Sequence, residues 1–149
     1  VEFGFVHYNP RETSPLRLAV EVGQRLVAAI HALPGSVYGP EFAELVYQAG
    51  KGDNPFGLSL GELQGIFGGK PRPQAVAWTT AYAEALDQRR FDQVLLEPDG
   101  VLPFVSDTTR DHGYVDAGPL FPSGDEYYRL ENHFMPNVHV WVPRERTAH

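Results

Sequence analysis

Three residues of this chain have the types and the setting of metal ligands. Glu97 directly follows a short apolar run, Val94 to Leu96, and His112 closes the polar segment 106–112. His7 lies in the first apolar segment of the chain. Two imidazoles and one carboxylate hold iron and similar metals and leave coordination positions open for a substrate. We therefore expect His7, Glu97 and His112 to bind iron or another divalent metal.

Such a centre also needs a side chain that moves a proton. Tyr8, Tyr114 and His139 are the candidates, with the substrate bound at the open metal positions. The spacing alone does not single out these residues, because separated His and Glu occur in most domains of this size. Two alternatives stay open: a metal-free pocket of Tyr, His and Asp, and a second polar group made by Glu131, Asn132 and His133 with His139.

Composition restricts the class of protein. The 149 residues are 42% hydrophobic and 12% aromatic, which predicts one globular domain spanning 1–149. The absence of cysteine excludes disulfides, thiolate nucleophiles and zinc sites built on sulfur. Any metal must be held by His, Asp, Glu or backbone oxygen.

Charge restricts the partners. The formal net charge is −7, and the basic residues are scattered, which argues against nucleic acid and anionic membranes. A small-molecule substrate or a basic protein fits this balance. No apolar run is long enough to span a bilayer and no signal peptide opens the chain. We therefore expect a cytoplasmic protein, with the reservation that the sequence begins at Val1 and not at Met.

The segment 91–118 contains the candidate acids and is predicted to form a β-hairpin. Val94 to Leu96 and Val101 to Val105 are two apolar runs on either side of Pro98-Asp99-Gly100. The polar segment 106–112 would follow the second strand. This arrangement would place Glu97 at the mouth of a buried strand.

The rest of the chain shows alternating and helical patterns. Ser14-Pro15 begins a predicted helix that runs to about Leu33, and a second helix is predicted from about Gln74 to Arg89. The segment 41–49 fits a helix or a strand equally well. Further elements are predicted as follows: strands at 1–8, 127–130 and 138–142, and a short helix at 59–67. This pattern predicts an α+β domain, with one antiparallel or mixed sheet and helices on one face.

Several stretches of the chain resemble the DOPA 4,5-dioxygenase-like family. They are VLLEPDG followed by TRDHGYVDAG, the opening FVHYNP, VYGPEFAELVYQ, and Trp78 with Arg89 or Arg90. The resemblance implies a ferredoxin-like α+β fold and extradiol cleavage of a catechol at iron, with His7 and His112 as ligands. The chain has Glu41 and Glu97 where the family has His. The resemblance implies that one of these acids replaces a lost ligand, or that the activity is absent.

Two classes of function follow from these observations. The first is a small metal-dependent enzyme that acts on an aromatic or polar small molecule. The second is a non-enzymatic acidic module, such as an immunity or inhibitor protein that neutralises a basic protein. Convergence of His7, Glu97 and His112 in the folded chain would favour the first class.

Overall fold

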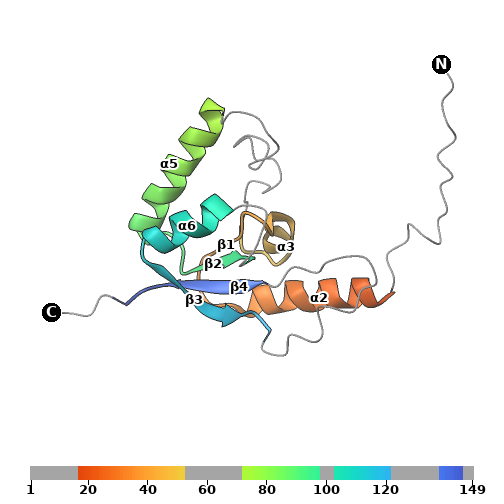
Figure 1. Cartoon of the computed structure of the whole chain (residues 1–149). Coiled ribbons are helices and arrows are strands. Elements are labelled where there is room, and N and C mark those ends of the chain that lie inside the picture. Colours follow the sequence, from red (N-terminus) through yellow and green to blue (C-terminus); the bar gives the residue numbers. More distant parts are fainter. Residues whose placement is uncertain (1–16, 53–71, 98–102, 122–137, 146–149) are drawn as a thin grey trace, which may run out of the picture.

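The computed structural model describes residues 17–52, 72–97, 103–121 and 138–145 (Figure 1). The predicted strands at 1–8 and 127–130, the predicted helix at 59–67 and the turn at 98–100 lie outside the described residues. So do His7, Tyr8 and the group of Glu131, Asn132 and His133.

The described residues form four helices longer than one turn and four strands. In chain order these are α2 (Arg17–Ala32), β1 (Val37–Tyr38), α3 (Ala43–Gln48), α5 (Pro73–Asp87), β2 (Gln93–Leu96), α6 (Pro103–Asp111), β3 (Tyr114–Pro119) and β4 (His139–Pro143). The two long helices and the last strand lie where the sequence predicts them. The ambiguous segment 41–49 contains the helix α3.

The strands form one mixed sheet in the order β1-β2-β4-β3. β1 pairs with β2 in parallel, and β4 is antiparallel to both of its neighbours, β2 and β3. β2 and β3 therefore run in the same direction, on either side of β4. This mixed sheet with its helices confirms the predicted α+β class.

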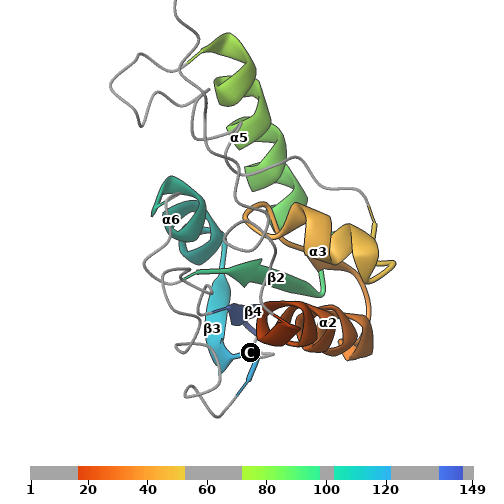
Figure 2. The same ribbon diagram turned by 90° about the vertical axis from the view of Figure 1, so that its right-hand side faces the viewer.

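The helices pack on both faces of the sheet, which corrects the expectation that they cover one face. Leu95 of β2 packs in a first core cluster with Val22, Leu26 and Ile30 of α2 and Val46 of α3. The adjacent Val94 and Leu96 pack in a second cluster with Tyr82 and Leu86 of α5 and Val105 of α6. Since neighbouring residues of a strand point to opposite faces, β2 is buried on both sides. Figure 2 shows α2 and α6 on opposite sides of the strands.

The second arm of the predicted hairpin is a helix, so the hairpin prediction is wrong. Pro103 lies within the apolar run and has no N–H for a strand ladder, whereas proline is well suited to the first turn of a helix. From there α6 buries Val105, Ser106 and Thr109 and exposes Asp107 and Arg110 on its other face. This spacing is helical, and it turns the segment back along the sheet.

Candidate active site at the carboxyl ends of β1 and β2

The carboxyl ends of β1 and β2 lie at the same edge of the sheet because the two strands are parallel. Glu41 follows β1 and Glu97 directly follows β2. The backbone N–H of Glu97 donates a hydrogen bond of 2.8 Å to Oε2 of Glu41, which joins the two strand ends. In open sheets with parallel strands, ligands bind outside this edge. We call it the carboxyl-end edge.

His139 lies at the carboxyl-end edge. It begins β4 and is the register partner of Leu96, the last residue of β2. Its Nδ1 lies 2.7 Å from Oδ2 of Asp116 on β3. The Asp116 carboxylate is itself held, because its Oδ1 accepts the backbone N–H of Gly118 at 2.7 Å. The exposed fractions of the His139 and Asp116 side chains are 17% and 36%, so both groups are within reach of solvent.

The contact fixes the orientation of the imidazole. A carboxylate only accepts hydrogen bonds, so the Nδ1 of His139 carries the proton when the ring is neutral. The other ring nitrogen, Nε2, is then an acceptor for a further partner. Histidines that act as general bases, and those that bind metals, are commonly held in this way by a carboxylate on the second nitrogen. We call this arrangement the His139–Asp116 pair.

His112 makes a similar contact in a different place. Its Nδ1 lies 2.7 Å from Oδ1 of Asp87, the last residue of α5, and His112 itself directly follows α6. The contact therefore joins the carboxyl ends of two helices. The Tyr114 hydroxyl, two residues further on, donates to the Phe91 carbonyl just before β2 at 2.6 Å. His112 consequently lies beside the start of β2.

The predicted metal site is not assembled by its described members. Glu97 lies beyond the end of β2 and His112 beside its start, because the helix α6 carries the chain back along the sheet between them. The third predicted ligand, His7, lies outside the described residues. Within 17–52, 72–97, 103–121 and 138–145, no three His, Asp or Glu side chains are grouped closely enough to hold a metal ion.

Tyr114 has a structural role in the core. Its ring is fully buried, and the Arg89 guanidinium lies over the ring at 5.3 Å from the centroid. Burial raises the pKa of the Tyr114 phenol above its ordinary value. Because its hydroxyl is used by the Phe91 carbonyl, Tyr114 is poorly placed to exchange protons with a substrate. Of the three predicted acid/base residues, Tyr8 lies outside the described residues and His139 is the one at the carboxyl-end edge.

Sequence reasoning missed Asp116 and Asp87, the partners of the two histidines. Asp116 lies 23 positions before His139, and the two residues meet only because β3 and β4 pair. The register also shifts between Asp116 and Pro119, where Gly118 has a φ of 105°. No local pattern specifies that register. A glycine two residues after an acid at the end of a strand was the available signal for an irregular, polar strand end.

Comparison of the chain with protein-family models, with curated proteins and with solved structures finds no match. The resemblance to the dioxygenase-like family therefore stays a prediction. In the part of the chain that the structure describes, no helix combines the length and apolar composition needed to cross a membrane.

Proposed function

We propose that the chain is an acid–base enzyme that acts on a polar small molecule at the carboxyl-end edge, with His139 as the proton-transferring residue. The observation that carries this proposal is the 2.7 Å contact between His139 and Asp116. Asp116 is positioned in turn by the N–H of Gly118. The hydrogen bond from Gly118 to Asp116 and the contact of Asp116 with His139 thus hold the imidazole in one orientation through its Nδ1.

The chemistry follows from the tautomer. Neutral His139 presents Nε2 as a base that can take a proton from a water molecule or from a substrate hydroxyl. The imidazolium that forms is stabilised by the Asp116 carboxylate, and it can return the proton to a leaving group. General acid–base catalysis by one positioned group contributes about 10²–10⁴-fold in rate. Asp116 acts through His139 and is a positioning residue.

The metal-dependent reaction, with iron or another divalent ion and extradiol ring cleavage, stays a prediction, since His7 lies outside the described residues. The acidic module that neutralises a basic protein also stays a prediction, supported by the net charge of −7. We favour the acid–base enzyme because it uses a contact between described side chains.

The proposal is tested with 4-nitrophenyl acetate, an ester that imidazoles hydrolyse. The control for chemistry is free imidazole at six equivalents, which matches the six histidines of the chain. We expect the protein to exceed this control and the variant His139→Gln to lose the excess. His112→Gln is the matched control variant, because His112 also contacts a carboxylate at 2.7 Å but lies beside the start of β2. It should retain the excess.

Asp116→Asn tests the positioning role. Gly118 and His139 contact different oxygens of Asp116, and an asparagine has an NH₂ group in place of one of these oxygens, so it cannot accept both hydrogen bonds in the present geometry. It would favour the tautomer with the proton on Nε2, as in other carboxylate–histidine sites. We expect most of the excess rate to be lost while the variant stays folded by circular dichroism. An equal loss in His112→Gln, or no excess over free imidazole in the parent protein, would refute the proposal.

A further inference from the structure

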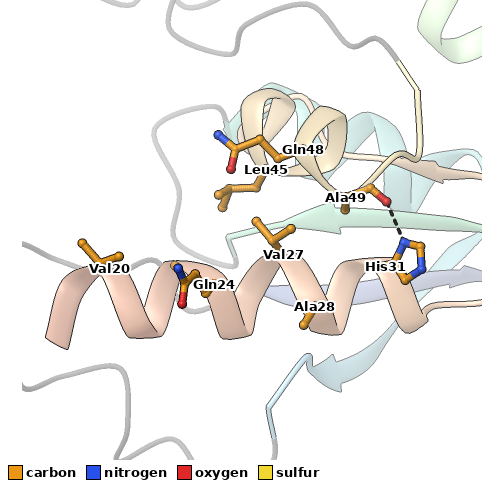
Figure 3. Close-up of a pocket in the computed structure, with 9 residues that line it drawn as sticks. Val20, Gln24, Val27, Ala28, His31, Leu45, Gln48 and Ala49 are labelled. Atoms are coloured by element: carbon orange, nitrogen blue, oxygen red, sulfur yellow. Dashed lines mark hydrogen bonds between the residues drawn. The ribbon is translucent and has the colours of Figure 1, made fainter. Parts of the chain in front are cut away.

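A groove of about 520 Å³ runs between α2 and α3 (Figure 3). Val27 and Leu45 point toward one another from the two helices, and Val20 and Ala28 extend the α2 wall. Cavities that bind small molecules commonly have this volume and a mostly apolar lining with a few polar groups. From this geometry we propose that the groove binds an uncharged small molecule with an apolar body and one hydrogen-bond donor.

The first support is a glycine in the wall of the groove. Gly23 lies in the interior of α2, where glycine costs about 0.5–1 kcal/mol relative to alanine. A Cβ atom added at Gly23 would meet nothing within 4 Å. Close packing therefore does not require glycine at this position. The missing side chain keeps the groove open, at a cost in helix stability.

The second support is the set of polar groups at the groove. Gln48 donates its Nε2 to Oε1 of Glu44 at 2.9 Å, which leaves its carbonyl oxygen as an acceptor. His31 places Nδ1 at 3.0 Å from the Ala49 carbonyl, so Nδ1 carries the proton and Nε2 of the neutral ring is an acceptor. Gln24 adds a side-chain amide. These acceptors favour a ligand that carries an O–H or N–H group.

The charge of the ligand follows from the lining. Among the described residues that line the groove, none is Asp, Glu, Lys or Arg. Transfer of a charged group into an apolar site without a partner of opposite charge is costly. An uncharged ligand avoids this cost, and a hydroxyl or N–H group on it would meet the acceptors of Gln48 and His31.

The groove is independent of the proposed catalytic site. Val27 and Leu45 pack against the first core cluster, on the α2 and α3 side of the sheet. His139 is the register partner of Leu96, whose side chain packs in the second cluster on the α5 and α6 side. Binding in the groove therefore does not depend on His139, and the two proposals can fail separately.

The experiment uses the fluorescent probe 2-naphthol, which has a flat apolar body and one hydroxyl donor. Naphthalene lacks the donor and 2-naphthoate carries a negative charge. We expect 2-naphthol to bind at least about tenfold more tightly than 2-naphthoate, and naphthalene to bind with an intermediate affinity. A tenfold difference in affinity corresponds to about 1.4 kcal/mol of binding free energy. His139→Gln should bind 2-naphthol like the parent protein.

Two substitutions at Gly23 give a matched comparison. Gly23→Leu projects a side chain into the groove and should weaken 2-naphthol binding at least about tenfold. Gly23→Ala removes the helix penalty without filling the groove, so its affinity should stay within about threefold of the parent. Thermal unfolding confirms that both variants are folded. Three results would overturn the proposal: no binding of 2-naphthol up to about 1 mM, unchanged affinity in folded Gly23→Leu, or equal affinity for 2-naphthoate.

Discussion

The buried contact between α5 and α6 gives a quantitative prediction about stability. Tyr82 of α5 places its hydroxyl 2.7 Å from Oγ1 of Thr109 on α6, and both side chains are buried. Thr109 Oγ1 donates its one hydrogen to the Val105 carbonyl at 2.6 Å. Tyr82 must therefore be the donor in the contact between the helices. Burial also raises the pKa of the Tyr82 phenol far above its ordinary value, so the donor proton stays in place.

The direction of this hydrogen bond makes the two deletions unequal. Tyr82→Phe removes the donor and leaves Thr109 bonded to Val105, so we expect the free energy of unfolding to fall by about 1 kcal/mol. Thr109→Val has nearly the same shape but leaves the Tyr82 hydroxyl buried without an acceptor, which costs about 1–3 kcal/mol. In the double variant neither polar group remains. It should be less destabilised than the sum of the two single variants.

Urea unfolding followed by tryptophan fluorescence measures these differences, since Trp78 stacks on Tyr82 at a centroid distance of 5.1 Å. The matched control is Thr80→Val. Thr80 makes the same hydroxyl contact to the carbonyl four residues earlier, at 3.0 Å, but is exposed, so its effect should stay within about 0.5 kcal/mol. The reasoning fails if Thr109→Val costs no more than Tyr82→Phe, or if the double variant is additive.

Three further predictions concern other contacts. Asp92→Asn should remove a pH-dependent part of the free energy of unfolding. Hydrogen bonds from the Ser36 backbone N–H and hydroxyl lower the pKa of Asp92 in the folded chain. The stability that Asp92 contributes is therefore present above its unfolded-state pKa near 3.8 and is lost as pH falls below that pKa. Urea midpoints of parent and variant, compared between about pH 6 and pH 2.5, should converge at the acid end, and a constant difference would contradict this assignment. Gly39→Ala should lower the free energy of unfolding by about 1–3 kcal/mol, because the added Cβ would lie 2.9 Å from Cγ2 of Val46. The matched substitution Gly23→Ala places its Cβ in open space and should raise the free energy of unfolding. Leu86→Ala, at a fully buried position in the second cluster, should cost about 2–5 kcal/mol, seen as a melting temperature lowered by about 2–4 °C per kcal/mol; a loss under about 1 kcal/mol would contradict its assignment to the core.

The sequence was most informative where one period covers a long segment. The stripe of Val22, Leu26 and Ile30 specifies α2 and its buried face, and the alternation of Val140 and Trp141 specifies the two faces of β4. The segment after Glu97 was predicted wrongly because its apolar run is short and fits a strand or a helix. Pro103 was the residue that distinguished them.

The site was harder to predict than the fold. His139 was a candidate from the sequence, but its partner Asp116 depends on which strands are neighbours and in which register. Glu97 and His112 were predicted to share a metal site, but α6 returns the chain to the start of β2, so His112 lies at the opposite end of that strand from Glu97. Pairwise geometry of this kind depends on tertiary contacts, which residue types alone do not determine.

The position of β4 has a consequence for how the chain acquires its structure. Among the described strands β4 (His139–Pro143) comes last in sequence, and it occupies the interior of the sheet between the earlier strands β2 and β3. During synthesis, β2 and β3 each keep an unpaired row of backbone donors and acceptors until the residues of β4 have left the ribosome. Completion of the sheet is therefore a late folding step that joins residues far apart in the sequence. A chain truncated before residue 139 would leave the edges of β2 and β3 that face β4 unpaired and would be prone to self-association.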